Sequence, residues 1–112
     1  MPDADVYVQV DNPACGDILR LALKTEQGQI SDARFRARGC VAAIASASQL
    51  CELIVGRSIG DARALRREDI VAALGGLPEA SVHASHLAID ALKAALRELA
   101  QASEYLQKQK GA

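Results

Sequence analysis

Apolar and polar residues alternate in three stretches near the start of the chain, and this period of two predicts β-strands. The three stretches cover residues 5–10, 18–24 and 30–37. Pro13 predicts a turn after the first stretch, and Gly28 predicts a hairpin loop between the other two. Two or three antiparallel strands are therefore expected before the first helix.

The apolar period then changes to that of an α-helix, which predicts a helix over residues 40–55 that ends at Gly56. The stripe expected to face the core consists of Val41, Ile44, Ala47 or Ser48, Cys51 and Val55. One or two shorter helices are expected between residues 61 and 74, with a break near Arg67.

A last helix is expected to begin near Ser81. Its apolar stripe consists of Leu92, Ala95 or Leu96, Leu99, Ala102 and Leu106. The polar tail over residues 107–112 is expected to fray.

The composition predicts one small domain over residues 1–112 with an aliphatic core. Hydrophobic residues make up 50% of the chain but aromatic residues only 3%, so alanine and aliphatic side chains must fill the interior. Close-packed helices with small residues are favoured over an aromatic-rich sandwich.

The net charge of -1 gives no electrostatic reason to expect binding to nucleic acid or to an anionic membrane. No export signal and no apolar run of about 18 residues is present, so a cytoplasmic protein is expected. Three cysteines are an odd number in such a chain, which favours thiol or metal chemistry over a disulfide framework.

Cys40 is the strongest candidate for a reactive or metal-binding sulfur. It stands where the third predicted strand passes through Gly39 into the first predicted helix. Free backbone N–H groups and the positive end of the helix dipole stabilise a thiolate at such a position.

Cys15 and Asp17 stand in the turn before the second predicted strand, on either side of Gly16. Residues two apart in extended chain face the same way, so a thiolate and a carboxylate can hold one cation there. A turn with a half-buried thiol is the alternative interpretation.

Cys51 is interpreted as a core residue. It follows Cys40 by eleven positions, so the two lie about 16 Å apart on a continuous helix, too far for one metal ion.

His83 and His86 are three positions apart and share a face near the start of the last predicted helix. An imidazole there can complete a metal site with Cys15, Asp17 and Cys40, and two surface histidines are the alternative.

Arg34, Arg36 and Arg38 occupy one face of the third predicted strand. This face is either simply solvated or a docking surface for an acidic partner.

Several spaced motifs together resemble the U-type iron-sulfur scaffold family, which comprises IscU, SufU and the N-terminal domain of NifU. They are N-P-A-C-G-D at 12–17, G-Q-I-S-D-A-R-F-R-A-R-G-C at 28–40, A-I-A-S-A-S at 43–48, G-R-S at 56–58, and L-P at 77–78 followed by H-A-S-H-L-A-I-D-A-L. The resemblance runs from about Val8 to Leu99. It implies an α+β fold in which a small antiparallel three-stranded sheet packs against helices, with a long C-terminal helix.

The resemblance also implies four ligands for a transient [2Fe-2S] cluster or for a zinc or iron ion: Cys15, Asp17, Cys40 and His83. Two soft and two harder donors suffice for tetrahedral zinc or ferrous iron. A cluster can use the same four donors, with nitrogen or oxygen on one iron as in Rieske centres, and should be labile. His86 is a substitute ligand one helical turn further on.

The chain departs from the family in two places. Ala84 stands where the third family cysteine is expected, and alanine has no donor atom. Only Leu77-Pro78 remains of the L-P-P-V-K motif that chaperones recognise in the IscU branch, so the resemblance implies chaperones as partners only through a degraded motif.

The leading hypothesis is a scaffold-like protein of iron-sulfur cluster assembly that is not an enzyme, with a cysteine desulfurase and apo iron-sulfur proteins as partners. A second hypothesis is a diverged paralogue that no longer builds clusters and acts as a zinc-binding or regulatory partner of a desulfurase or scaffold. A third is a thiol enzyme that accepts persulfide sulfur on Cys40.

Overall fold

The computed structural model contains three strands followed by helices. It describes residues 4–12, 16–39, 41–76 and 83–110. The side chains of residues 12, 83, 84 and 102–110 are not described. The elements are β1 (Val6–Asn12), β2 (Asp17–Glu26), β3 (Gln29–Arg38), α1 (Val41–Ile54), α2 (Ile59–Arg63), α3 (Arg67–Ala73) and α4 (His83–Lys110). The strands form one antiparallel sheet in the order β1-β2-β3. This arrangement confirms the α+β fold with a small three-stranded sheet and a long C-terminal helix.

The hairpin between β2 and β3 closes through Gln27 and Gly28, which have positive φ angles of 53° and 79°. Two consecutive residues with positive φ match the twist of antiparallel strands, and glycine adopts this conformation without strain. The predicted hairpin around Gly28 is therefore confirmed.

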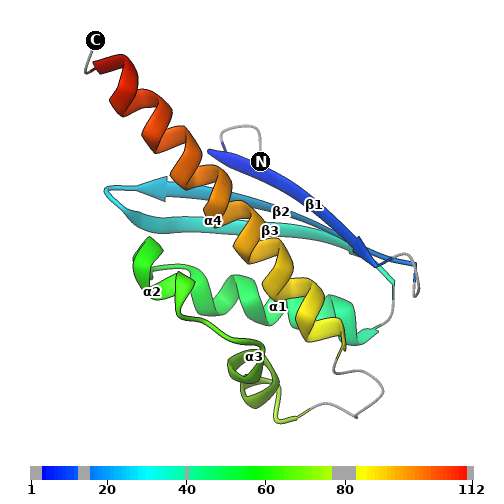
Figure 1. Cartoon of the computed structure of the whole chain (residues 1–112). Helices are drawn as coiled ribbons and strands as arrows, with labels where there is room; N and C mark the ends of the chain where they lie inside the picture. The colour runs from blue at the N-terminus through cyan, green and yellow to red at the C-terminus, as the bar shows by residue number, and fades with distance from the viewer. Residues whose placement is uncertain (1–3, 13–15, 40, 77–82, 111–112) are drawn as a thin grey trace.

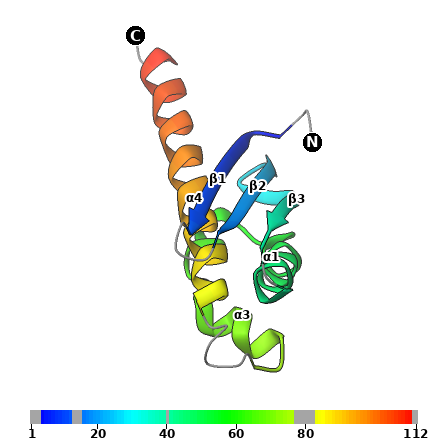
Figure 2. The same cartoon turned by 90° about the vertical axis from the view of Figure 1, so that its right-hand side faces the viewer.

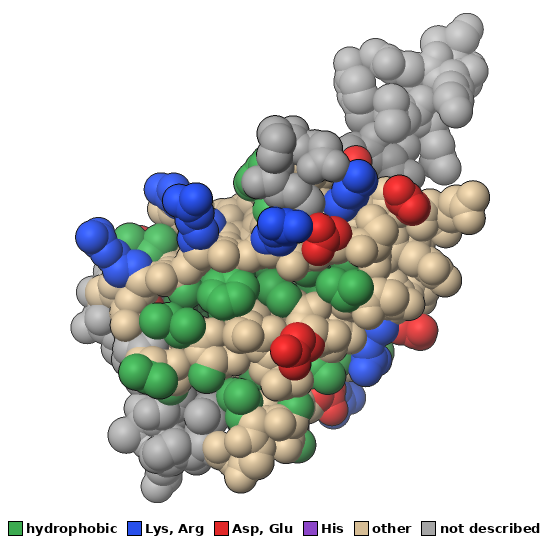
Figure 3. Space-filling model, turned by 180° about the vertical axis from the view of Figure 1, so that it is seen from behind, with side chains coloured by type: hydrophobic (Ala, Val, Ile, Leu, Met, Phe, Trp, Pro, Cys, Tyr) green, Lys and Arg blue, Asp and Glu red, His purple; other side chains and the backbone are tan. Residues whose placement is uncertain are grey.

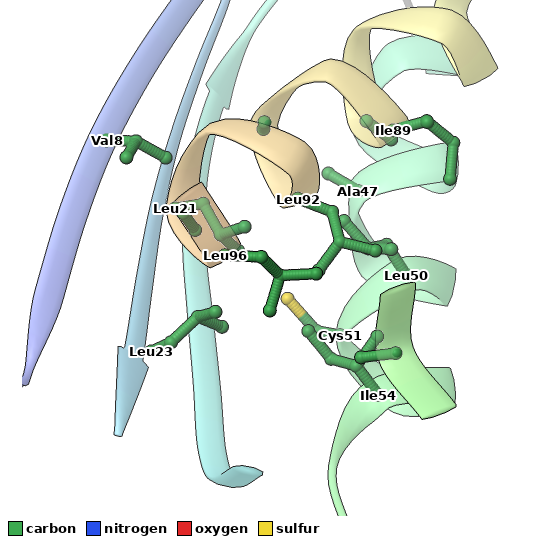
Figure 4. Close-up of a cluster of buried hydrophobic side chains, with 14 of the residues drawn as sticks. Val8, Leu21, Leu23, Ala47, Leu50, Cys51, Ile54, Ile89, Leu92 and Leu96 are labelled. Carbon is green, nitrogen blue, oxygen red and sulfur yellow. The ribbon is translucent and has the colours of Figure 1, made fainter. Parts of the chain in front are cut away.

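All of the described helices lie on one face of the sheet, as the two views in Figures 1 and 2 agree. Helix α4 crosses β1 and β2, and α1 runs along β3. The face of the sheet that meets the helices is apolar, because Val8, Leu21 and Phe35 stand opposite one another across the three strands. The helices and this face enclose the core, where Leu19, Leu21 and Leu23 are 0–1% exposed. Figure 4 shows leucines of β2 meeting α1 and α4 there.

Helix α1 covers the predicted residues but is rotated from the predicted orientation. Its buried residues are Ala43, Ser46, Ala47, Leu50, Cys51 and Ile54. Val41, Ile44 and Val55 were expected to face the core, and this expectation is wrong, since they are 82%, 42% and 44% exposed. Small side chains on the buried face let α1 approach β3 and α4 closely, and this packing outweighs the burial of the larger residues.

The region between residues 59 and 73 contains two short helices, as predicted, although the first begins slightly earlier than expected. Ser58 caps α2 by accepting a hydrogen bond from the backbone N–H of Asp61 at 3.1 Å. The Asp69 carboxylate accepts from the backbone N–H of Arg66 at 2.8 Å and so fixes the start of α3.

Helix α4 buries Leu92, Ala95 and Leu96 against the sheet and α1, as its apolar period predicts. It continues to Lys110, so the tail expected to fray is helical over residues 107–110. Glutamine and lysine are good helix formers, which favours continuation of the helix through this tail. Within the described residues, no helix has the length and apolar character needed to cross a membrane.

Candidate functional site

One end of the sheet gathers the segments that carry the predicted ligands. Asp17 is the first residue of β2 and pairs with Asn12 at the end of β1. On the other side Ile18 pairs with Arg38, so Gly39 follows beside Asp17 at the end of β3. The register therefore brings together the backbone that precedes residue 40, the end of β1 that leads to residue 15, and the Asp17 carboxylate.

Gly39 packs directly against the Asp17 side chain. A Cβ at position 39 would lie 2.0 Å from Asp17 Oδ1 and 2.7 Å from Asp17 Cγ. Gly39 also has a φ of +140°, which residues other than glycine rarely adopt. Both the conformation and the close approach therefore require glycine, and they hold the 2% exposed Asp17 carboxylate against the strand that leads to residue 40.

Two helices begin at this same end of the molecule. Helix α1 begins at Val41 and α4 begins at His83, and Figures 1 and 2 both place these starts on the side where β2 begins. Neither helix has an acidic residue in its first turn. The partial positive charge of each N-terminus is therefore not offset by its own helix, which favours anionic groups at this end.

The structure describes only two of the four predicted ligands, and one of these only by its backbone. Asp17 is placed in full, and His83 is placed as the first residue of α4 by its backbone alone. Cys15 and Cys40 lie outside the described residues. No group of three or more potential metal ligands occurs among the residues whose side chains are placed, and that set leaves out three of the four predicted donors. The four-donor site thus stays a prediction.

His86, the predicted substitute ligand, is exposed on α4 and contacts Arg67 of α3. Arg67 Nη1 lies 3.4 Å from His86 Nδ1 and also contacts Nε2. A guanidinium cation at the ring occupies the nitrogen lone pair that a metal ion needs. In this arrangement His86 serves to join α3 to α4.

Cys51 belongs to the core, as the spacing argument predicted. It is 8% exposed, and Figure 4 shows its sulfur among the apolar side chains between α1, α4 and the sheet. Burial raises the pKa of its thiol from 9.0 to about 11, and the charge of Asp32 adds to the rise. The thiol therefore stays protonated near neutral pH and is a poor ligand or nucleophile.

Two features of this region could not be found from the sequence pattern. The contact between Gly39 and Asp17 depends on the register of two strands, although a glycine immediately before Cys40 is a visible signal. Ser46 is fully buried in α1, and its Oγ has no hydrogen-bond partner in the described structure. A serine in an alanine-rich stretch gives no sign of which way it points.

The chain is similar to a known protein family over nearly its whole length. The model of the NifU-like N-terminal domain matches residues 1–110. The "iron-sulfur cluster assembly scaffold protein IscU 1" of Archaeoglobus fulgidus is 42% identical over 94 residues, 84% of this chain and 61% of that protein. The scaffold protein IscU of Escherichia coli K12 is 44% identical over 90 residues, 80% of this chain and 70% of that protein.

The chain thus spans about three fifths of the length of the Archaeoglobus relative. Among solved structures, the N-terminal part of a nitrogen-fixing NifU-like protein from Brucella abortus superposes with a TM-score of 0.71 at 19% identity. That match covers 90% of this chain and 83% of the other, and it supports the fold.

Proposed function

The chain belongs to the NifU-like N-terminal domain family, and from this premise we propose that it is a scaffold on which an iron-sulfur cluster is assembled and then passed on. Relatives that share more than two fifths of their aligned residues with it are named as scaffolds of this kind. Their names do not favour the alternative of a regulatory paralogue. They are not names of enzymes, and the proposal assigns no catalytic turnover to the chain.

The observation that carries the proposal is the convergence at one end of the sheet. Asp17 and the Gly39 backbone next to residue 40 lie side by side there, and α4 starts at the same end of the molecule. In the proposal, Cys15, Asp17, Cys40 and His83 hold the cargo, which is a [2Fe-2S] cluster or an iron or zinc ion. Two thiolates supply soft ligands, and the carboxylate and imidazole supply harder ones.

A site of this kind suits a cluster that is released. With only two sulfur ligands from the protein, the cluster is held less firmly than by four cysteines. Asp17 is buried and fixed at the start of β2, so it can keep its position while cargo is loaded and removed. A cysteine desulfurase as the sulfur source and apo iron-sulfur proteins as recipients complete the proposed cycle.

The test is reconstitution of the protein with iron and sulfide without oxygen, followed by an absorption spectrum and by iron and sulfide analysis. Wild-type protein should show a cluster spectrum with about two irons and two sulfides per site. The variants Cys15→Ala, Cys40→Ala and His83→Ala should each lose most of the bound iron.

Matched controls are Cys51→Ala for the two cysteine variants and His86→Ala for the histidine variant. Cys51 is a core thiol and His86 contacts Arg67, so both controls should retain the cluster. If His86→Ala loses iron and His83→Ala keeps it, the ligand assignment is wrong. If the wild type stays colourless with zinc or with no metal, the regulatory paralogue becomes the better explanation.

A further inference from the structure

The face of the sheet turned away from the helices carries four exposed arginines. They are Arg20 of β2 and Arg34, Arg36 and Arg38 of β3, and together they are called the arginine face. Figure 3 shows lysine and arginine side chains along one margin of the molecule, with acidic side chains beside some of them, next to a band of hydrophobic side chains. This local concentration of positive charge contrasts with the net charge of -1 of the whole chain.

Like charges oppose one another within the arginine face. Arg20 and Arg36 are direct cross-strand partners, and such a pair destabilises a sheet. Arg20 donates to Gln9 Oε1 at 2.8 Å, and Arg34 lies 3.4 Å from Asp32 Oδ2. Neither Arg36 nor Arg38 has a hydrogen-bond or ion-pair partner among the described residues. Among the described residues, no carboxylate is therefore seen to pair with Arg36 or Arg38 and relieve this repulsion.

Apolar side chains lie between the arginines of this face. One cleft of about 410 Å³ is bounded by Ile18, Arg20, Arg36 and Arg38. A second cleft of about 500 Å³ adjoins it, and its lining includes Tyr7 and Ala22. Tyr7 is 55% exposed. An exposed tyrosine among arginines, with apolar side chains between them, has the composition of protein–protein hot spots.

In the part of the chain that the structure describes, few carboxylates lie on this face to neutralise it. Asp5 accepts hydrogen bonds from the backbone and side chain of Thr25, and Asp32 pairs with Arg34. Both stand toward the end of the sheet away from Arg38. Asp11 of β1 lies across from Ile18 at the other end. At the end of the sheet next to Gly39, the three positive charges of Arg20, Arg36 and Arg38 thus exceed the single negative charge of Asp11.

We propose that the arginine face docks the acidic surface of a partner protein. Carboxylates accept paired hydrogen bonds from guanidinium groups, and side chains two residues apart on a strand repeat every ~7 Å, which a row of acidic residues can match. Binding removes the repulsion between Arg20 and Arg36. Nucleic acid and anionic membranes fit less well, because long phosphate arrays also meet the negative charge elsewhere on the chain.

The docking proposal stands independently of cluster assembly, since none of the four arginines is a proposed cluster ligand. Arg38 directly precedes Gly39, so a partner on this face lies beside the end of the sheet that carries Asp17. A variant that loses docking should still take up iron and sulfide as wild type does. The two proposals can therefore fail separately.

The test measures binding of a fluorescein-labelled oligoglutamate peptide to the full chain by fluorescence anisotropy. Wild-type protein should bind at low salt and lose about tenfold in affinity when salt is raised to about 0.15 M. The double variant Arg36→Gln with Arg38→Gln should bind about tenfold more weakly at low salt. Its thermal unfolding midpoint should be unchanged or higher, which shows that the loss is not caused by misfolding.

The matched control removes the same charge at another exposed basic site, with Arg63→Gln and Arg66→Gln near α2 and α3. This control should change the affinity less than twofold. Equal losses in the two double variants would mean that only net charge matters, and the proposal would be wrong. Absence of binding at low salt would also overturn it, as would tighter binding of an oligothymidylate probe than of oligoglutamate.

Discussion

Replacing Gly39 by alanine tests whether the Asp17 contact holds the site end of the sheet together. The new Cβ would lie 2.0 Å from Asp17 Oδ1, so the carboxylate would have to move by more than ~1 Å to restore ordinary contact. Asp17 is 2% exposed, and displacing a buried polar group costs about 1–3 kcal/mol. Alanine at a φ of +140° adds about 1–2 kcal/mol of backbone strain.

Part of this cost is offset because alanine restricts the unfolded chain, which contributes about 0.4–1 kcal/mol to stability. We therefore expect Gly39→Ala to lower the free energy of unfolding by about 3 kcal/mol. For a chain of this size that corresponds to a fall of roughly 10 °C in the melting temperature. Thermal and urea unfolding followed by circular dichroism measure both quantities.

Gly56→Ala is the matched control, because Gly56 has a φ of +88° and nothing lies within 4 Å of the position of its Cβ. It should cost only the backbone strain, about 1 kcal/mol. A second comparison places Gly39→Ala in an Asp17→Ala background, where the blocking carboxylate is gone and the cost should fall by about half. If Gly39→Ala costs no more than Gly56→Ala, or if the Asp17 background leaves its cost unchanged, the contact does not have the role assigned to it.

Three further predictions concern stability. Ser46→Ala should raise the free energy of unfolding in urea by about 1 kcal/mol, because it removes a buried hydroxyl that has no hydrogen-bond partner among the described residues. The control Ser48→Ala, at an exposed position, should show only a helix-propensity gain of about 0.5 kcal/mol. Equal gains in the two variants would contradict this reasoning. The pKa of Cys51 is raised to about 11, so the folded chain keeps a thiol proton that the unfolded chain releases above pH 9.0. The stability that this thiol contributes is therefore complete below pH 9.0 and is lost as the pH rises toward 11. Over that range the unfolding free energy of the wild type in urea should fall by about 2 kcal/mol relative to Cys51→Ala. Parallel pH profiles of the two proteins would refute this prediction. Arg36→Gln should raise the unfolding free energy by about 0.5 kcal/mol by removing the like charge opposite Arg20, as thermal unfolding can test, and a loss of stability would show that the pair is not repulsive.

The strands were predictable because one face of the sheet is covered and the other is open. Leucines and charged residues then alternate along β2, and the period of two is plain in the sequence. The hairpin at Gln27 and Gly28 was predictable for a local reason, since glycine permits the turn. Elements whose form follows from neighbouring residues in the chain were therefore found correctly.

The orientation of α1 was not predictable, because several stripes of this helix are apolar. Ala43 and Ala47 face the core while Val41 and Ile44 face outward, although side-chain hydrophobicity favours the opposite choice. The decision depends on how closely the helix approaches β3 and α4, and a single sequence does not contain that distance.

The candidate site was predictable only as a set of donors. Spaced motifs identified the family, and the match of its model to residues 1–110 confirmed this. The contact of Gly39 with Asp17 requires strand register, which the local pattern does not encode. The grouping of Cys15, Cys40 and the His83 side chain with Asp17 stays a prediction, because those three side chains lie outside the described residues.

The packing of α1 also has an evolutionary consequence. Ala43 and Ala47 are 4% and 0% exposed, so each added methylene at these positions overpacks the interior at a cost of about 1–3 kcal/mol. Val41 and Ile44, on the outward side, can change to polar residues with little effect on folding. In the first two turns of this helix, tolerance to mutation therefore follows exposure and not hydrophobicity: the alanines are constrained, and the larger outward residues are free to vary.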